Sequence, residues 1–380
     1  MTNRTDWLLD PDVAYLNHGA FGALPRVVGE AASGLRAEME GNPANLMARR
    51  LPGMLDDIRN QVAALLHADP AGSTFVGNAT AGTATVLTAL GSDLGPGDEV
   101  LTTDHRYGAV GVQLETLADR TGASIVTAHV PLDIATRADV VAALAERVTA
   151  HTKLLVIDSI ASASGFVFPL AEIIPAMHDL GIPVVVDAAH APGQLDVDLE
   201  ALGADFWVGN LHKWVSSPRA AAILNVAPKW RDRVRPLVPS HHFAKGYQPA
   251  FDWTGTFDPI PILAIPAALA FWAEFGWDEM RATQRAIVDD GAARVAKALG
   301  TTAPAADDFR AAMRVIELPV TLDVERAYDV EAVLSAEHKV EVSLMSLHAR
   351  SYVRVCGQVY NTPSDYDRLA EALPGLVEAE

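Results

Sequence analysis

Two apolar segments of this chain end in residues that could do chemistry together. Residues 184–186 lead into Asp187, and residues 206–209 lead through Asn-Leu-His to Lys213. Because open parallel sheets bind ligands beyond the carboxyl ends of their strands, neighbouring strands would aim both side chains into one crevice. A lysine amine can hold the aldehyde of pyridoxal 5′-phosphate as a Schiff base, while a buried aspartate keeps its pyridine nitrogen protonated. The pair predicts a pyridoxal-phosphate site.

Each residue alone also has an ordinary explanation. Most lysines are solvated surface charges, and an aspartate after a strand commonly caps the next helix. Lys213 departs from the surface pattern, because it follows an apolar strand and precedes Trp214 and Val215 rather than more charge. Its combination with Asp187 therefore favours a site.

The segment 77–83, Gly-Asn-Ala-Thr-Ala-Gly-Thr, lies between a predicted strand and a predicted helix. Small residues and hydroxyls at a helix start offer N–H donors and the positive end of the helix dipole to an anion. We interpret the segment as a phosphate cup, and the alternative is that Asn78 or Thr80 only caps the helix. It matches neither Gly-x-Gly-x-x-Gly nor the P-loop, so dinucleotide and nucleoside-triphosphate binding lose support.

Further polar residues follow predicted strands or lie in them. A flat side chain at His105 or Tyr107 could stack on a cofactor ring, although a histidine here is more often a plain loop residue. Ser162 and Ser164 could reach the cofactor's phenolic oxygen, or could be turn residues. Arg354 is a candidate for the substrate's α-carboxylate, because a guanidinium binds both oxygens at once. A surface ion pair is the competing account of Arg354.

The elements that must position these residues are those of a doubly wound α/β domain with a mostly parallel sheet covered by helices. The predicted strands are 73–76, 99–103, 124–128, 153–160, 183–187, 205–208 and 220–226, and helices are predicted at 53–66 and 81–90. After about residue 257 come two long helices, 262–275 and 278–299, a loop at 301–308, and short strands near 313–318 and 352–355.

We therefore expect three parts in the chain. Residues 42–257 form a large cofactor-binding domain, and residues 258–380 form a smaller α+β domain. Residues 1–41 form an N-terminal segment associated with the small domain and the active site.

Composition excludes several classes of function. The net charge of −19 disfavours nucleic-acid binding, since no basic cluster is set apart. With neither a signal pattern nor a membrane-length apolar run, we expect a cytoplasmic protein that does not bind membranes. The single Cys356 excludes an intrachain disulfide, and without cysteine clusters we expect no metal.

These residues carry a resemblance that runs over nearly the whole chain. The chain resembles fold-type I pyridoxal-phosphate enzymes of the class V aminotransferase group, and within it isopenicillin N epimerase-like proteins. The segments that carry the likeness are 15–22 (Tyr-Leu-Asn-His-Gly-Ala-Phe-Gly), 78–80, 104–109, 187–193, 210–214, 252–256 (Asp-Trp-Thr-Gly-Thr), Arg354 and 360–362.

The resemblance implies a role for each site residue. Lys213 is the Schiff-base lysine, and Asp187 pairs with the pyridine nitrogen. His105 is expected to stack on the ring, with Tyr107 close behind. The phosphate is implied to lie among Asn78, Ala79, Thr80, Asn210 and His212, the phenolic oxygen near His190 and Ser162, and the substrate near Asn17, His18 and Arg354. Gly255 and Thr256 match a segment lent to the neighbouring subunit's phosphate site, which implies a homodimer with shared active sites.

The implied activity is amino-acid epimerisation through an external aldimine and abstraction of the α-proton by Lys213. Inversion needs a second acid or a mobile lysine, and His18, His105 and Tyr107 are candidates for that acid. A β-eliminating C–S lyase and an aminotransferase of the same group share the first steps and stay open. Cysteine desulfurases of the group carry a loop cysteine before the arginine, but 338–348 has none, so persulfide transfer is disfavoured. A nicotinamide-dependent dehydrogenase and an inactive α/β binding protein are weaker alternatives.

Overall fold

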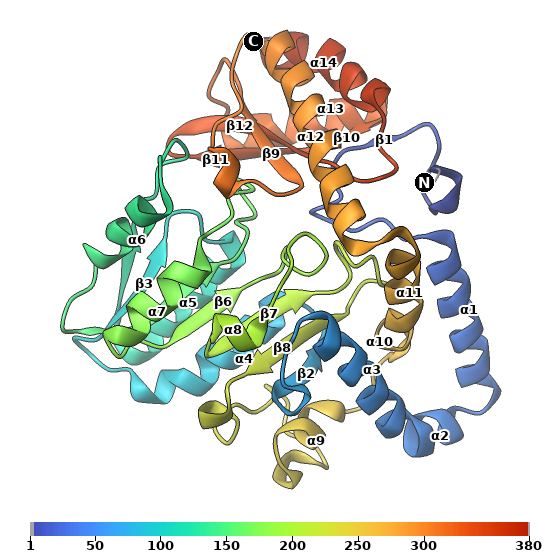
Figure 1. Ribbon diagram of the computed structural model, residues 1–380, viewed down its shortest axis with the longest axis vertical. Helices are drawn as coiled ribbons and strands as arrows, with labels where there is room; N and C mark the ends of the chain where they lie inside the picture. The colour runs from blue at the N-terminus through green and yellow to red at the C-terminus, as the bar shows by residue number, and fades with distance from the viewer. Residues whose placement is uncertain (1–3, 379–380) are drawn as a thin grey trace.

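The computed structural model describes residues 4–378 and divides them into a large and a small domain (Figure 1). A seven-stranded sheet forms the centre of the large domain, with strand order β2-β8-β7-β6-β5-β3-β4. The strands are β2 (Ser73–Val76), β3 (Glu99–Thr103), β4 (Ser124–Ala128), β5 (Thr152–Asp158), β6 (Val184–Asp187), β7 (Phe206–Asn210) and β8 (Ala222–Val226). The five neighbouring strands β7, β6, β5, β3 and β4 are parallel to one another. Strand β8 pairs antiparallel with both β7 and β2.

Helices cover both faces of this sheet. Val185 faces the core under α4 and α5, whereas its neighbours Val184 and Val186 face the opposite core. Alternate residues of one strand are thus both buried, which explains the continuous apolar runs in the sequence. The helices up to residue 252 are α1 (Arg26–Gly41), α2 (Pro43–Asn45), α3 (Leu51–Leu65), α4 (Ala79–Leu90), α5 (Gly108–Thr121), α6 (Arg137–Ala145), α7 (Leu170–Asp179), α8 (Leu199–Leu202) and α9 (Tyr247–Asp252).

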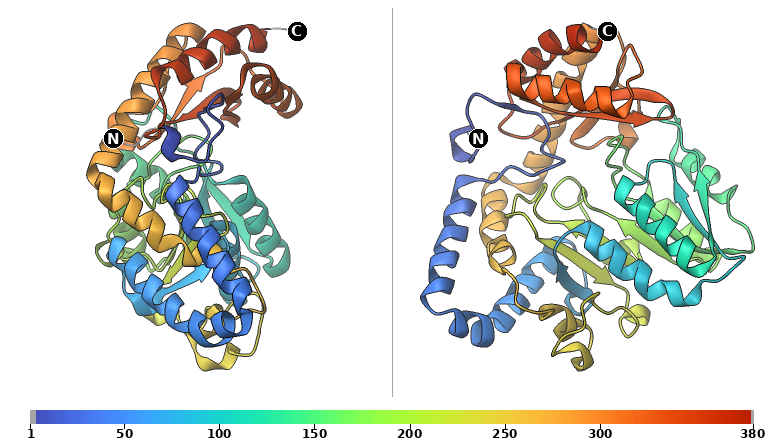
Figure 2. Two further views of the ribbon diagram at one scale, coloured as in Figure 1. Left: turned by 90° about the vertical axis from the view of Figure 1, so that its right-hand side faces the viewer. Right: turned by 180° about the vertical axis from the view of Figure 1, so that it is seen from behind.

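The small domain packs helices on a three-stranded antiparallel sheet in the order β11-β12-β9. Its strands are β9 (Met313–Glu317), β11 (Ser343–Leu347) and β12 (Arg350–Cys356), and its helices are α12 (Trp277–Leu299), α13 (Val324–His338) and α14 (Pro363–Glu378). The N-terminal segment joins this domain, because β1 (Ala14–Tyr15) pairs in parallel with β10 (Val340–Glu341). Figure 2 shows this segment passing along the junction of the two domains.

The first two helices after residue 258 belong to the core of the large domain. The predicted helix 262–275 is two helices, α10 (Ile260–Leu263) and α11 (Ile265–Phe275). Pro266 explains the break, because a proline ring clashes with the carbonyl of the residue four positions earlier. Apolar residues of both helices pack in the same cluster as the sheet, whereas the separate core of the small domain begins within α12.

The expected fold class is confirmed, and so are most of the predicted elements. Strands β2, β3 and β4 have the predicted bounds, and the predicted helix 278–299 is one residue short of α12. No single helix within residues 4–378 has both the length and the apolar composition to cross a membrane; only the bent pair Ile260–Phe275 and Trp277–Leu299 passes that test jointly.

Candidate active site

Lys213 and Asp187 lie at the ends of adjacent parallel strands, as expected. Asp187 is the last residue of β6, and Lys213 follows β7 in a turn whose next residue, Trp214, is fully buried. His190 lies beside the lysine, because its Nε2 is 3.2 Å from Lys213 Nζ. The sheet topology therefore brings an amine, an imidazole and a carboxylate to one edge.

The hydrogen bonds of His190 indicate the protonation state of the Lys213 amine. The Trp214 indole N–H donates to His190 Nδ1 over 3.3 Å, so that nitrogen carries no proton. A neutral imidazole must then carry its proton on Nε2, which faces Lys213 Nζ. An N–H donor can bond an unprotonated amine but not an ammonium. The contact therefore favours the neutral, nucleophilic form of Lys213 over the ammonium.

The pKa values agree with this assignment. Burial, and then the positive charge of Arg354, lower the pKa of Lys213 to about 8, although Asp187 opposes them. Burial, and then the charge of Lys213, hold the pKa of His190 well below its ordinary value. Both groups are thus biased towards their neutral forms.

A second carboxylate, which the sequence analysis missed, lies beside Asp187. Asp158 is the last residue of β5 and pairs in register with Asp187 of β6. Each is 4 % exposed. Burial, and then the neighbouring charge of Asp187, hold the pKa of Asp158 well above its ordinary value. Burial also raises the pKa of Asp187, against the opposing Ala189 N–H and Lys213 charge. The apolar run 154–157 that ends in Asp158 was the available signal.

The predicted phosphate cup is the N-terminus of α4, and part of it is already occupied by side chains. Asn210 Oδ1 accepts the Ala79 N–H at 2.8 Å, and Asn78 Oδ1 accepts the Ala81 N–H at 2.8 Å. Of the first three helix residues, Thr80 alone keeps an N–H with no partner among the described residues. His212 lies at the end of the same strand pair, with its Nδ1 2.8 Å from the Ala221 carbonyl. Asn210 thus orients the cup, while Thr80 remains free to donate.

The two candidates for ring stacking differ in exposure. His105 is fully buried, its Nδ1 lies 2.8 Å from Ser164 Oγ, and its Nε2 lies 2.6 Å from the Val130 carbonyl. Tyr107 is 43 % exposed, and its backbone N–H donates to the Asp158 carboxyl. Of the two residues, only Tyr107 is exposed, and its backbone lies next to Asp158.

Arg354 is buried at 2 % exposure and faces the large domain. Its Nη1 donates to the carbonyl and hydroxyl oxygens of Ser162 at 2.5 and 3.2 Å, and its Nη2 donates to Asn17 Oδ1 at 3.0 Å. Its Nε is buried with no partner among the described residues. A surface ion pair is therefore wrong for Arg354. Ser162, expected near the phenolic oxygen, accepts both of these hydrogen bonds from Arg354 Nη1.

The N-terminal segment supports the lysine turn. His18 is fully buried, with Nε2 3.0 Å from the Lys213 carbonyl oxygen and Nδ1 3.1 Å from the Tyr360 hydroxyl. Burial lowers the pKa of His18 to about 3, so the ring is neutral and fully engaged. Gly22 packs directly on the same turn: a Cβ there would lie 2.5 Å from the Lys213 carbonyl oxygen.

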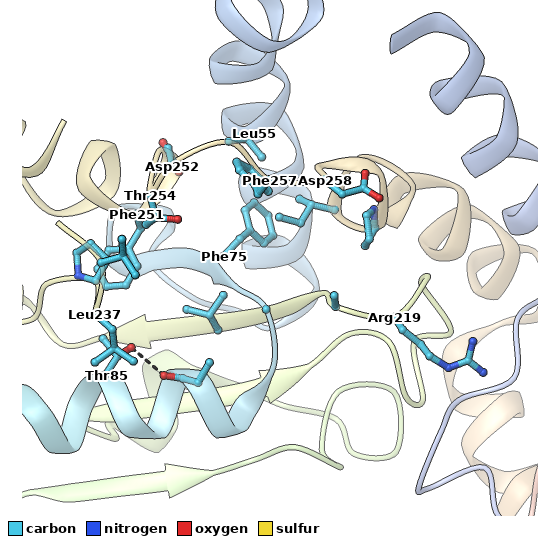
Figure 3. A pocket seen from close by; sticks show the side chains of 18 residues that line it. Leu55, Phe75, Thr85, Arg219, Leu237, Phe251, Asp252, Thr254, Phe257 and Asp258 are labelled. Carbon is cyan, nitrogen blue, oxygen red and sulfur yellow. Dashed lines mark hydrogen bonds between the residues drawn. The ribbon is translucent and has the colours of Figure 1, made fainter. Parts of the chain in front are cut away.

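The segment implied to serve a neighbouring subunit lies at an open apolar face. Gly255 has a φ of +116°, and Thr256 is exposed. Next to them is a cavity of about 560 Å³, drawn in Figure 3, which reaches from Thr254 to Gly77 and Ala81 at the start of α4. Most of its other lining is apolar and includes Phe75, Leu237, Phe251 and Phe257. Gly255 and Thr256 share no described contact with Lys213 in their own chain.

These features fit a flat, anionic heterocycle with an aldehyde. An amine with a lowered pKa, a buried carboxylate with a raised pKa, a partly open helix N-terminus and an exposed aromatic residue lie at one edge of the sheet. The Nε of Arg354 has no hydrogen-bond partner among the described residues, so it can donate to a further anionic group. The arrangement can form an imine and move a proton at Lys213 Nζ.

Comparisons with known proteins agree with this chemistry. The family described as Aminotransferase class-V matches residues 14–369. An isopenicillin N epimerase of Streptomyces clavuligerus is 30% identical, covering 98% of this chain and 97% of the relative. A probable chloroplastic L-cysteine desulfhydrase of Arabidopsis thaliana is 28% identical, covering 97% of this chain and 84% of the relative.

Solved structures show the same fold. A mutant of C-DES with glycine covalently linked to its PLP cofactor superposes with a TM-score of 0.82 at 20% identity, covering 100% of both chains. The Escherichia coli cysteine desulfurase CsdA superposes with a TM-score of 0.81 at 22% identity, covering 99% of this chain and 97% of that one. At these identities the likeness speaks for the fold alone.

Proposed function

This chain belongs to the aminotransferase class-V family, and from that premise we propose that it is a pyridoxal 5′-phosphate-dependent amino-acid epimerase. The observation that carries the proposal is the Lys213 amine with a lowered pKa beside His190, at the strand end next to Asp187. The 30% identical epimerase, matched over nearly its full length, supports the choice of reaction.

Five residues would hold the cofactor. Lys213 Nζ would hold its aldehyde, Asp187 its pyridine nitrogen, and His190 and Thr80 its phenolic and phosphate oxygens. Tyr107 takes the stacking position in this proposal, because His105 has no open face. When bound, the cofactor supplies an electron sink that acidifies the α-hydrogen of an attached amino acid.

The remaining work falls on the side chains. Arg354, held by Ser162 and Asn17, binds the substrate's α-carboxylate and fixes which face of the α-carbon meets Lys213. Lys213 Nζ then removes the α-proton. Inversion needs a proton on the other face, and of the three candidate acids His18 and His105 are buried with both ring nitrogens engaged. Tyr107 is therefore the proposed second acid.

A C–S lyase is the second candidate, favoured by the relatives described as L-cysteine desulfhydrases. It would use the same residues up to proton removal and then expel a β-substituent. Cysteine-dependent desulfuration is not proposed. Cys356 is the only cysteine, lies buried in β12, and accepts a 3.2 Å hydrogen bond from the Gly19 N–H. Burial raises its pKa, which disfavours the nucleophilic thiolate.

We propose that the active enzyme is a homodimer. The apolar cavity of Figure 3 is flanked by Leu237 and Val238, which are 49 % and 56 % exposed. A second copy that covers this face would hide these side chains from water. Thr256 of each subunit would then serve the phosphate site of the other subunit. The cytoplasmic location stays a prediction.

One incubation separates the two reactions. Each of a panel of L- and D-amino acids, sulfur-containing ones included, is incubated with the holoenzyme in D2O. Epimerisation gives α-deuterated amino acid of inverted configuration, whereas a lyase gives oxo acid and free thiol. Tyr107→Phe keeps the ring but removes the hydroxyl, so α-deuteration should continue while inversion falls. Oxo acid and thiol without inverted product would refute the epimerase proposal.

Complementation in trans tests the dimer. Lys213→Ala and Thr256→Ala are each prepared as inactive or weakened homodimers and then mixed under exchange conditions. In a shared site, half of the mixed dimers' sites combine native Lys213 with native Thr256, so activity should recover. No recovery, with subunit exchange verified by mass, would refute shared sites.

A further inference from the structure

Three side chains from both domains converge outside the proposed cofactor site. Asp104 follows β3, His129 follows β4, and His348 lies in the turn between β11 and β12. His129 Nδ1 lies 2.5 Å and His348 Nε2 lies 2.7 Å from the same oxygen, Asp104 Oδ2. One ligand atom of each residue lies within 4.8 Å of the other two. We propose that Asp104, His129 and His348 form a binding site for a divalent transition-metal ion such as Zn²⁺.

The backbone holds the two large-domain ligands side by side. Strands β3 and β4 are parallel neighbours with Thr103 opposite Ala128, so the residues that follow them are adjacent. The other carboxylate oxygen of Asp104 accepts the Val130 N–H at 3.1 Å, which fixes the plane of the carboxylate and leaves Oδ2 for the cluster. Such support of a ligand by the backbone is typical of metal sites.

The third ligand is delivered by an unusual turn. His348 and Ala349 have φ values of +51° and +59° between paired Leu347 and Arg350, which makes a two-residue hairpin turn with both residues left-handed. Such turns strongly prefer Asn-Gly, because other side chains are strained in the left-handed region. His348 therefore occupies a position that disfavours its side chain, and its ring reaches across the domain junction to Asp104.

The donor set matches the chemistry of Zn²⁺. Two imidazoles and one carboxylate leave the fourth tetrahedral position for water. Ligand atoms bound at ~2.0–2.1 Å to one tetrahedral ion lie roughly 3.3 Å apart. The nitrogens now lie 2.5 and 2.7 Å from Asp104 Oδ2, so each needs to move away from it by about 0.6–0.8 Å. Solvent can enter, because His129 is 65 % exposed while the other two side chains are about one-fifth exposed.

The carboxylate is already in the form that a metal requires. Burial alone would raise the pKa of Asp104, but the His129 hydrogen bond and the nearby His105 and His348 rings outweigh it, so the pKa falls below its ordinary value. A bound ion would replace the ring protons that now face Oδ2. It would also tie the small-domain turn to the large domain, one residue before His105.

Direct metal binding tests the proposal. Untagged holoenzyme is treated with a chelator, dialysed, and titrated with Zn²⁺ by equilibrium dialysis in the absence of amino acids. We expect one Zn²⁺ per chain, with affinity weakened about tenfold or more in His129→Asn and in His348→Asn. The matched control, His151→Asn, changes an exposed histidine outside the cluster and should bind as the native protein does.

Co²⁺ gives a second readout that does not depend on activity. The native protein should show the visible bands of a four-coordinate Co²⁺ site, and both variants should lose them. His129 is exposed at the surface, so its replacement leaves the core intact, and circular dichroism verifies the fold. No stoichiometric Zn²⁺ binding, or binding that is equal in the native protein, His129→Asn and His348→Asn, would overturn the proposal.

Discussion

Gly22 is predicted to set the position of Lys213, the proposed Schiff-base lysine, by close backbone contact. A Cβ added at Gly22 would lie 2.3 Å from the His212 carbonyl oxygen, 2.5 Å from the Lys213 carbonyl oxygen and 2.9 Å from Lys213 Cα. Ordinary contacts of a Cβ begin at 3.4 Å, so the lysine turn must move by about 1 Å. All three atoms belong to the backbone, and no flexible side chain is there to give way.

The displacement gives the expected size of the effect. A shift of about 1 Å at a reacting group costs roughly 100-fold in rate, and overpacking costs about 1–3 kcal/mol in stability. We expect Gly22→Ala to lower kcat/KM about 100-fold on whichever amino acid the panel identifies. Cofactor absorbance and borohydride trapping on the Lys213 peptide report how much lysine still engages the cofactor.

The control for Gly22→Ala is a glycine with space around it. Gly34 in α1 has no atom within 4 Å of an added Cβ, so Gly34→Ala should keep full activity and gain up to about 1 kcal/mol of stability. Native kcat/KM and native cofactor affinity in Gly22→Ala would refute the reasoning, because the turn would then tolerate the intrusion.

Three further predictions follow from the same structure. Since the pKa of Lys213 is about 8, the rate of cofactor attachment to the cofactor-free protein should rise with pH, reach half of its maximum near pH 8 and level off about one unit higher, measured by stopped-flow absorbance; an inflection near 10.5 would contradict the lowered pKa. Ala220 has a φ of +73°, so Ala220→Gly should raise the free energy of unfolding by about 0.5–1 kcal/mol, measured in urea, and a loss would contradict the strain. Because the folded pKa of His18 is about 3 and its ordinary value 6.5, the unfolded chain gains a proton first as pH falls. Native stability should therefore decline from pH 6.5 towards 3, and less steeply in His18→Asn; equal slopes would exclude His18 as the cause.

The sequence was most informative where a strand ends in a polar residue. The rule that ligands lie beyond the carboxyl ends of parallel strands located Asp187 and Lys213, and the structure places both at one sheet edge. The same rule applied to Asp158 would have found the second carboxylate. The local sequence around Asp158 does not show which acid lies beside it, because the pairing of β5 with β6 is a property of the folded sheet.

Side-chain direction could not be predicted in the turns. His105 and Tyr107 are two residues apart after β3, and only the turn into α5 decides that the first ring points inward and the second outward. The metal cluster was hidden for another reason. His129 and His348 belong to different domains, and no local spacing relates them. The expectation of no metal rested on cysteine clusters, a test that histidine and aspartate ligands escape.

The charges of the site also connect substrate binding to proton transfer. Arg354 contributes to the lowered pKa of Lys213, and its hydrogen-bond partners among the described residues are the neutral groups of Ser162 and Asn17. A substrate carboxylate on Arg354 would neutralise that positive charge and so raise the pKa of the free lysine amine. A stronger base would thus be available only when an amino acid with a free carboxylate is in place. Discrimination against amines that lack the carboxylate would then appear in the rate of proton removal as well as in binding.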